Sequence, residues 1–314
     1  MSTLRILSPG FQTTVQDLGR PRYTHLGISP SGAADPVSLR LGNLLVGNPQ
    51  GAAALEMTLV GGMFEFSEDS VVALTGSDFG ATLNGSPVLV WRSFAVRKGE
   101  ILQCGATKNG ARCYLCIRGA LDVPLVLGSL STHLMTQLGG LNGRSLQAGD
   151  QFTVHENQPD AFRHHALDGG AVIQVLKRDT MRVTRGPQAE LFSDEAIHAF
   201  SSSPYRVSED SNRMGLRLTG HLTRKIWTTD MVTEGVPLGA VQISHDGEPI
   251  ILFVEHQTTG GYPKIANVIS ADLHRLGQLR PRDEVRFEFV TVDQALQSLN
   301  DLELLISSTS LKPL

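Results

Sequence analysis

The sequence predicts a mainly β fold with a few short helices. Its 32 glycines and 15 prolines are spread along all 314 residues, which is typical of many short strands joined by tight turns. Two turn signals, Asn84-Gly85 and Asp246-Gly247, stand in similar surroundings in the two halves of the chain, and a proline soon after each opens a strand. We therefore expect a duplicated β unit, with chance similarity as the alternative. Short apolar or alternating runs predict strands of the first copy at 63–66, 71–74, 88–91 and 101–104.

Helices are predicted where a capping residue precedes a run suited to a helix. The pair Asp35-Pro36 fits the start of one helix, and Gly47 fits its end. A short helix is expected to begin at Ser193, where acidic residues follow, and a closing helix is expected after Thr291, which has the spacing of a capping box. The apolar run 172–177 is predicted to be a strand.

The predicted chemistry lies in the segment 255–278, which follows the apolar run 250–254. Its apolar residues recur at helical spacing as far as Gly277, and Pro263 suits the first position of a helix. A helix start presents unpaired N–H groups with partial positive charge, so we expect a site for a carboxylate, a phosphate or a developing oxyanion. An ordinary strand-to-helix turn is the alternative. The residues expected at this site are Gln257, Thr258, Thr259, Gly260, Gly261, Tyr262 and Lys264.

Polar residues elsewhere in the chain are further candidates for ligand contacts. Asp17 and Arg20 are predicted to form an ion pair or to hold a substrate, with a surface turn pair as the alternative. Arg213 adds a cation and Gln242 adds an amide. Ser131 does not stand in a nucleophile elbow, and no pattern places a His and an Asp beside it. Hydrogen bonding to a ligand or to loop backbone is therefore favoured for this serine.

The cysteines are predicted to be buried thiols. Cys113 and Cys116 form a C-x-x-C, which also fits a metal or redox site. However, the segment 113–117 fits a buried strand, in which positions three apart point to opposite faces. The sequence has no second C-x-x-C and no His-x-x-x-His pair to complete a zinc site. Core packing is therefore favoured for both residues and for Cys104.

Charge and hydropathy exclude several classes of protein. The 27 basic and 31 acidic residues give a net charge of −4 without a block of like charge, which argues against a nucleic-acid partner. No apolar run approaches the ~18 residues of a membrane span. The N-terminus lacks the basic and apolar regions of a signal peptide. We expect a cytoplasmic protein with no membrane association.

Taken together, these motifs resemble the family of 5-oxoprolinase C subunits, also described as the KipI-antagonist or biotin-dependent carboxyltransferase family and related to allophanate hydrolase subunit 2. The resemblance spans nearly the whole chain in order, and its QTTGGYPK segment is specific. Three places depart from the usual family pattern, namely Glu255, Arg118-Gly119-Ala120 and Arg282. The matching motifs are TTVQDLGR (13–20), SGAAD (31–35), LEMTL (55–59), DVPLVLGSLST (122–132), GGLNGRSL (139–146), RGPQAELF (185–192), NRMGLRL (212–218), GAVQI (239–243) and QTTGGYPKIANVI (257–269).

The resemblance implies two related β-barrel domains of cyclophilin-like type, which we expect at residues 1–178 and 179–314. It implies a direct partner, which is a homologue of the B subunit of 5-oxoprolinase, and a homologue of the A subunit in the full enzyme. The complete assembly would open the lactam of a small-molecule substrate, 5-oxoproline, to glutamate, with ATP and Mg as cofactors. The chain alone is expected to be inactive, and a homo-oligomer is left open.

The resemblance and the chemistry of lactam opening together give each candidate residue an expected role. The site should bind a carboxylate and stabilise an anionic intermediate by fixed donors. We expect Lys264 and the 258–261 backbone to stabilise the anion, and Gln257 and Thr259 to hydrogen-bond the substrate. The expected clamps for a carboxylate or phosphate are Arg213 and Arg20, with Asp17 holding Arg20.

Two other functions are compatible with the same motifs. One is a regulatory binding protein that antagonises a sensor-kinase inhibitor, the homologue of the B subunit. The other is carboxyl transfer from carboxybiotin to urea or a related amide. Biotin would then have to come from a partner, because this chain has no biotin-carrier segment.

Overall fold

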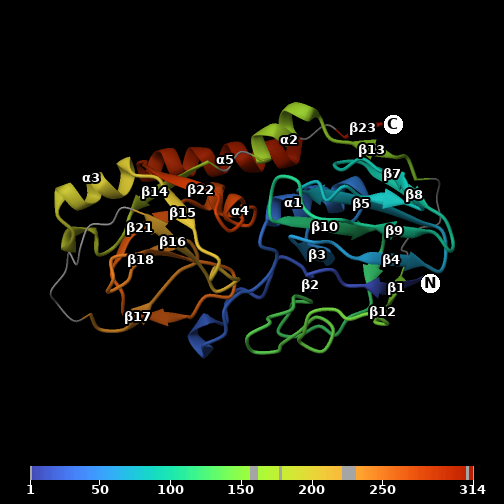
Figure 1. The fold of residues 1–314 in the computed structure, drawn as a ribbon, viewed down its shortest axis with the longest axis horizontal. Helices are drawn as coiled ribbons and strands as arrows, with labels where there is room; N and C mark the ends of the chain where they lie inside the picture. Colours follow the sequence, from blue (N-terminus) through green and yellow to red (C-terminus); the bar gives the residue numbers. More distant parts are fainter. Residues whose placement is uncertain (1, 156–161, 177–178, 221–230, 309–310, 314) are drawn as a thin grey trace. The chain divides into compact units, whose positions relative to one another are not determined.

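The computed structural model describes residues 2–155, 162–176, 179–220, 231–308 and 311–313. The chain divides into two compact units (Figure 1). The first unit comprises residues 1–20, 31–176 and 305–314, and the second comprises residues 21–30 and 177–304. The boundary expected after residue 178 falls at positions 177 and 178, which lie outside the described residues.

In the first unit, short antiparallel strands form two sheets around one apolar core. One sheet has seven strands in the order β11-β12-β1-β4-β9-β6-β7, and the other has five in the order β2-β3-β10-β5-β8. Side chains such as Leu4, Phe64 and Leu115 are fully buried in this core. The strands are β1 (Ser2–Ser8), β2 (Gln12–Gln16), β3 (Ala54–Thr58), β4 (Met63–Phe66), β5 (Ser70–Gly76), β6 (Thr82–Leu83), β7 (Ser86–Pro87), β8 (Ser93–Val96), β9 (Ile101–Gln103), β10 (Arg112–Ile117), β11 (Ala120–Leu121), β12 (Gln151–His155) and the separate pair β13 (His165–Ala166) and β23 (Lys312–Pro313).

Two local predictions for the first unit are confirmed. Helix α1 (Pro36–Leu45) begins at Asp35, whose Oδ1 accepts the backbone N–H of Ser38 at 2.9 Å. The β6–β7 hairpin turns at Asn84 and Gly85, which have φ values of 47° and 84°. Both residues occupy the left-handed region that a two-residue hairpin requires.

Two other predictions for the first unit are wrong. The run 172–177 belongs to helix α2 (Gly169–Leu176), apart from residue 177, which lies outside the described residues. The Asp168 carboxylate accepts the N–H of Gly170 at 3.0 Å at the start of this helix, and a short apolar run fits a helix as well as a strand. The run 88–91 is irregular, and Trp91 leaves the extended region with a φ of 63°.

The three cysteines lie in the core of the first unit. Cys113 and Cys116 belong to β10 and are fully buried, so the predicted buried strand is confirmed. All three thiols are free. Burial raises the pKa of Cys104 to about 12, and it raises the pKa of the other two thiols as well.

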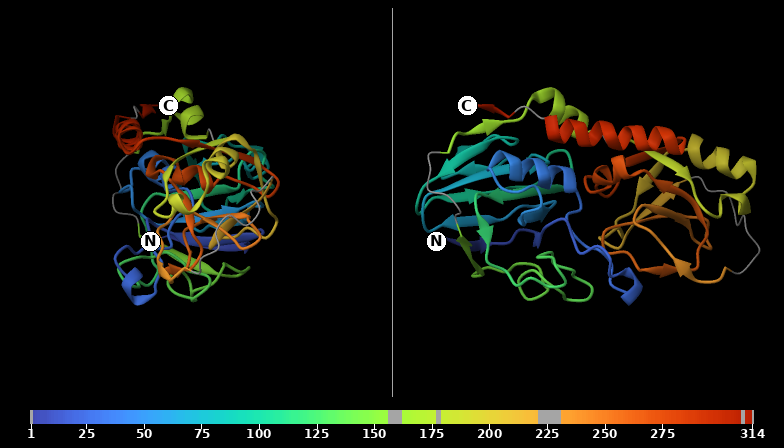
Figure 2. Two further views of the ribbon diagram at one scale, coloured as in Figure 1. Left: turned by 90° about the vertical axis from the view of Figure 1, so that its left-hand side faces the viewer. Right: turned by 180° about the vertical axis from the view of Figure 1, so that it is seen from behind.

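The second unit is a closed barrel of seven strands in the order β14-β21-β18-β19-β16-β15-β22 (Figure 2, right). β14 and β22 are parallel and the remaining pairs are antiparallel. The mainly β fold is thus confirmed. The strands are β14 (Thr180–Arg185), β15 (Tyr205–Val207), β16 (Gly215–Gly220), β18 (Ala240–Ile243), β19 (Pro249–Leu252), β21 (Lys264–Val268), β22 (Glu284–Phe289) and, outside the barrel, β17 (Glu234–Gly235) and β20 (Thr259–Gly260).

The helix predicted from Pro263 to Gly277 is wrong. Residues Lys264–Val268 form strand β21, which pairs on one side with β14 and on the other with β18. Only η3 (Ser270–Asp272) and the single turn α4 (Leu273–Leu276) are helical. The apolar residues of this segment have helical spacing, but pairing with two neighbouring strands, which closes the barrel, decides its conformation instead.

The predicted helix starts of the second unit are confirmed. Ser193 caps α3 (Asp194–Ser202) by accepting the N–H of Ala196 at 3.3 Å. Thr291 and Gln294 form the expected capping box before α5 (Val292–Ser308), with reciprocal hydrogen bonds of 2.8 and 3.2 Å. The remaining 3-10 turns are η1 (Thr24–Leu26) and η2 (Ala189–Leu191).

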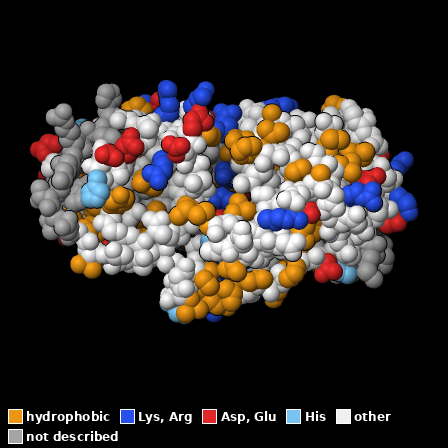
Figure 3. All heavy atoms as spheres, turned by 60° about the horizontal axis from the view of Figure 1, so that its bottom comes forward, with side chains coloured by type: hydrophobic (Ala, Val, Ile, Leu, Met, Phe, Trp, Pro, Cys, Tyr) orange, Lys and Arg blue, Asp and Glu red, His pale blue; other side chains and the backbone are white. Residues whose placement is uncertain are grey.

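Charged side chains of both signs are interspersed on the face shown in Figure 3, and hydrophobic side chains gather in one area of it. In the first unit, Leu125 and Met135 are large hydrophobic residues that are more than half exposed, at 69% and 63%. No helix in the described part of the chain is both long enough and apolar enough to span a bilayer.

Candidate functional site

The candidate site of the second unit is built on the outward-facing row of residues across four barrel strands. Neighbouring strands place Arg217 opposite Ile250, Ile250 opposite Gln242, and Gln242 opposite Lys264. Side chains alternate along a strand, so these residues point away from the barrel interior, which buries Leu216 and the other members of the alternate rows.

A β-bulge brings Lys264 into this row. The register between β18 and β21 shifts after Val241, so that Gln242 pairs with Lys264 and Ile265 is the extra residue. The Lys264 side chain is only 1% exposed, and its Nζ donates to Glu234 Oε1 at 2.5 Å. Without the bulge, the alternation along β21 would direct this ammonium group to the other face.

Glu234 connects the barrel to the β17–β20 ribbon. Its Oε1 accepts from Lys264 Nζ and from Gln188 Nε2, the latter at 2.7 Å, and its side chain is 44% exposed. The hydrogen bond from Lys264 lowers the pKa of the Glu234 carboxyl below its ordinary value. The buried lysine charge is therefore matched by a carboxylate that stays ionised.

The β17–β20 ribbon packs directly on the outer face of the barrel. Val236, which follows β17, forms a small apolar cluster with Ala240 and Leu252. A Cβ atom on Gly260 would lie 2.8 Å from Gln242 Nε2, so a larger residue at this position would displace the end of the Gln242 side chain. Gly260 and Thr259 pair with β17, which places their backbone in a β ladder.

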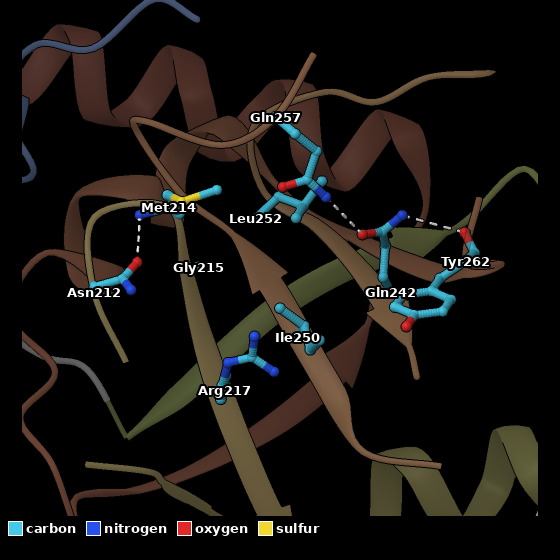
Figure 4. Close-up of a pocket in the computed structure, with 9 residues that line it drawn as sticks. All are labelled: Asn212, Met214, Gly215, Arg217, Gln242, Ile250, Leu252, Gln257 and Tyr262. Atoms are coloured by element: carbon cyan, nitrogen blue, oxygen red, sulfur yellow. Dashed lines mark hydrogen bonds between the residues drawn. The ribbon is translucent and has the colours of Figure 1, made fainter. Parts of the chain in front are cut away.

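Two glutamine amides form a relay beside the ribbon (Figure 4). Gln257 Nε2 donates to Gln242 Oε1 at 3.3 Å, and Gln242 Nε2 donates to the Tyr262 backbone oxygen at 3.2 Å. The Tyr262 ring meets His245 edge to face, with centroids 5.2 Å apart. Each amide uses one of its donors in this chain, so both retain hydrogen-bonding capacity for a ligand.

The relay forms one wall of a pocket of about 170 Å³. This volume is well above the ~15 Å³ that one water molecule needs. The polar lining comes from amides and one guanidinium, and the apolar lining comes from three aliphatic or thioether side chains. The lining residues are Asn212, Met214, Gly215, Arg217, Gln242, Ile250, Leu252, Gln257 and Tyr262 (Figure 4).

Arg213 lies outside this lining, although its two sequence neighbours belong to it. Its side chain is 5% exposed, and its Nε donates to Glu255 Oε1 at 2.5 Å. The Glu255 N–H also donates to the Arg213 backbone oxygen at 2.8 Å. The guanidinium expected to clamp a carboxylate is thus engaged in a buried ion pair, and the family departure at Glu255 preserves a carboxylate for it.

The other predicted residues lie together in the first unit. The Asp17 carboxylate accepts the hydroxyls of Ser129 at 2.7 Å and Ser131 at 2.5 Å, and it also accepts the backbone N–H groups of Gly19 and Leu130. Arg20 is 1% exposed and donates to the backbone oxygen of Ser131. Asp17, Arg20 and Ser131 therefore hold the chain around residues 126–131 in place.

The structure thus divides the predicted site residues into those that line the pocket, those of the adjoining ribbon, the buried cations Lys264 and Arg213, and the residues Asp17, Arg20 and Ser131 of the first unit. Gln242, Gln257 and Tyr262 line the pocket, and residues 258–261 lead into or belong to the adjoining ribbon. Lys264 belongs to the same cross-strand row but lies outside the pocket lining and faces Glu234. The expectation of an anion site at a helix start is wrong, because the segment continues into a strand and its backbone pairs with β17.

The sequence reasoning missed several residues of this site. Arg217 stood in a recognised motif, and its alternation with the apolar Leu216 and Leu218 would have placed it on the outer face. Glu234 lies outside the recognised motifs and Gln188 stands in one of them, but no local pattern indicates that either residue reaches Lys264, which is distant in sequence.

The described residues show no metal site built from a cluster of protein side chains alone. They contain no group of three or more His, Cys, Asp or Glu side chains arranged to hold a metal ion. The sequence also has no P-loop to cradle the phosphates of a nucleotide.

Most of the chain matches a known protein family. The family model described as carboxyltransferase domain, subdomain A and B, matches residues 26–289. The chain belongs to this family. Within it, the C subunit of 5-oxoprolinase from Escherichia coli strain K12 is 38% identical over 298 residues, which are 95% of this chain and 94% of that protein.

Larger members of the carboxyltransferase domain family are also similar to this chain. Urea amidolyase of Saccharomyces cerevisiae is 34% identical over 305 residues, which are 91% of this chain and 16% of that protein. The solved structure of the K. lactis urea amidolyase superposes with a TM-score of 0.90 at 32% identity and covers 98% of this chain and 20% of that chain. The fold of this chain is therefore that of a carboxyltransferase domain.

Proposed function

We propose that this chain is the C subunit of an ATP-dependent 5-oxoprolinase, which opens the 5-oxoproline lactam to glutamate together with the A and B subunits. The observation that carries the proposal is the match to the C subunit of E. coli 5-oxoprolinase over nearly the full length of both chains. The chain is an essential part of the enzyme in this proposal and is inactive alone.

The amide relay supplies the recognition of the lactam. A lactam has its N–H and its C=O on the same edge of the ring, and a carboxamide presents the same pair of groups in complementary order. Gln257 and Gln242 are two of the three pocket residues that carry a carboxamide, and they are the two joined by a hydrogen bond. A fixed amide donor at the lactam oxygen also stabilises the negative charge that develops there when the carbonyl carbon is attacked, before the C–N bond breaks.

Lys264 and the ribbon position this edge. The Lys264–Glu234 ion pair anchors β17, and β20 rests on the Gln242 amide at Gly260. Lys264 is accordingly a positioning residue in the proposed site. Thr259 is also a positioning residue, because it belongs to the ribbon strand that contacts the Gln242 amide. ATP and Mg²⁺ are assigned to the assembled complex of the three chains.

The test is ATP-dependent release of glutamate from 5-oxoproline by this chain mixed with its two partners, the A and B subunits. We expect activity with all three chains and none when any one is omitted. Activity that persists without this chain would refute the catalytic proposal. If the chain still bound the B subunit under those conditions, the regulatory function would be favoured instead.

Carboxyl transfer is the second candidate function. It is supported by the family description and by the similarity to urea amidolyase. A biotinylated partner would deliver the carboxyl group to urea or a related amide held at the same relay. The measurement is transfer of labelled carboxylate from carboxybiotin to urea by the chain with such a partner, and no transfer above the rate without the chain would reject it.

A further inference from the structure

The pocket contains a cation that the proposed lactam recognition does not use. Arg217 is the charged residue among the nine that line the pocket. Its side chain is exposed on β16, and within the described parts of the chain no carboxylate contacts its guanidinium. Arg213, by contrast, is buried against Glu255. The five N–H donors of Arg217 are thus available to a ligand.

Arg217 and the amide relay lie at opposite ends of one apolar floor. Ile250 stands between Arg217 and Gln242 in the cross-strand row, and Leu252 continues the floor along β19. Adjacent strands are about 4.8 Å apart, so the backbones that carry Arg217 and Gln242 are separated by ~10 Å. Two hydrogen bonds and a small ring that bears a carboxylate fill such a span.

The pocket is open above this floor because β16 carries Gly215 there. This glycine is paired with Leu252, and a Cβ atom in its place would lie 3.2 Å from Ile250 Cγ2. A side chain at position 215 would therefore occupy the space between the cation and the amides. The arrangement leaves room for an apolar ring between two polar ends.

We propose that Arg217 binds the carboxylate of the substrate and so selects a carboxylated lactam over a neutral amide. The inference rests on the proposed function and adds the specificity of its site. A guanidinium binds a carboxylate through two parallel hydrogen bonds, which a neutral amide of the size of urea cannot replace. Arg217 is thereby a specificity-determining residue, and the relay is the part of the pocket that a neutral amide would share.

The first test measures steady-state kinetics of the complete complex of the three chains. With Arg217→Ala we expect KM for 5-oxoproline to rise about 10- to 100-fold while kcat changes little, because a charged hydrogen-bonding partner of the substrate is lost. Arg217→Lys should recover part of the loss, since it restores the charge without the paired donors. Arg206→Ala is the matched control, because Arg206 is an exposed arginine on the adjoining strand and lies outside the pocket lining.

The second test measures equilibrium binding to the full chain by calorimetry, so that it does not depend on turnover. The probes are 5-oxoproline and 2-pyrrolidinone, which is the same ring without the carboxylate. We expect wild type to prefer 5-oxoproline and Arg217→Ala to bind both probes equally weakly. Equal binding of the two probes by wild type, no binding of 5-oxoproline by wild type, or an unchanged KM in Arg217→Ala would overturn the inference. A wild-type complex that releases no glutamate while the chain still prefers 5-oxoproline would refute the proposed function alone.

Discussion

The Lys264–Glu234 pair joins an almost fully buried ammonium group to a half-exposed carboxylate. Removing the carboxylate leaves a buried charge unpaired, which costs more than the loss of an exposed ion pair. The same segment was expected to present Lys264 to an anionic intermediate. Because Glu234 is its partner, Lys264 should contribute to the stability of the fold, and this contribution can be measured with mutations.

We expect Glu234→Gln to lower the free energy of unfolding by about 1–2 kcal/mol, discounted for the exposure of the carboxylate. Urea denaturation at neutral pH measures the change. Glu209→Gln is the matched control, because Glu209 and Arg282 form an ion pair that is 62% and 80% exposed. The control should change stability by less than ~0.5 kcal/mol. Equal effects of the two substitutions would contradict the assignment.

The same pair predicts a pH dependence of known sign. Lys264 lowers the pKa of Glu234 in the folded state, so the folded carboxyl binds its proton less readily than the unfolded one. Its contribution is complete above the unfolded value of about 4.3 and is lost as pH falls through the lower folded pKa. The stability difference between wild type and Glu234→Gln should therefore shrink below pH ~4. A difference that grows on acidification would reverse the assigned sign.

The relay of Gln257 and Gln242 should determine how well the complete enzyme uses its substrate. Gln257→Leu removes one carboxamide at similar volume, so that the lactam edge loses half of its partners. We expect kcat/KM for glutamate release by the complete complex to fall about 10- to 100-fold. Thermal unfolding of the variant serves as the control for folding. A variant with wild-type kcat/KM would exclude Gln257 from substrate recognition.

At the scale of elements, Gly260 sets how closely the β17–β20 ribbon approaches the Gln242 side chain on the barrel. In Gly260→Ala the added methyl group would meet the movable end of Gln242, so the amide shifts at little cost in stability. We expect the variant to fold normally but to lose activity, with KM raised more than about threefold. Gly261→Ala is the matched control, since its nearest atom would be Thr233 Oγ1 at an ordinary 3.6 Å. Similar kinetics for the two variants would argue against contact between the ribbon and the relay.

Elements fixed by local chemistry could be predicted from the sequence. The caps at Asp35, Ser193 and Thr291 and the hairpin at Asn84 depend on neighbours within a few residues, and the structure contains all four. The strand β21 could not be predicted in this way. Its conformation is decided by β14 and β18, which are remote in sequence, and its apolar residues suit either element.

The candidate site was predictable only in part for the same reason. Gln242, Gln257 and Tyr262 were selected by their place in a motif, and the pocket brings them together. The partners of Lys264 and Arg213 depend on a bulge and on a buried ion pair, neither of which a pattern of residue types reveals. The residues of the 13–20 motif belong to the other unit, where they organise a loop.

At the scale of the whole molecule, the buried cysteines provide a probe that reports the unfolding of the first unit. All three lie in the first unit, and burial raises their pKa, so that little reactive thiolate forms near neutral pH. We expect Ellman's reagent to label no thiol in the native chain and three in denaturant. The rate of labelling at intermediate denaturant should follow the unfolding of the first unit. Rapid labelling of the native chain would contradict the burial of these side chains.

The barrel of the second unit is closed by strands from opposite ends of its sequence. β14 comes first and β22 comes last, and their parallel pairing completes the cylinder. During synthesis on the ribosome, β14 therefore has one edge without its final neighbour until residues 284–289 have emerged. Pairing at such sequence separation is slow compared with helix or hairpin formation, so translation of the last strand sets the earliest moment at which this barrel can exist.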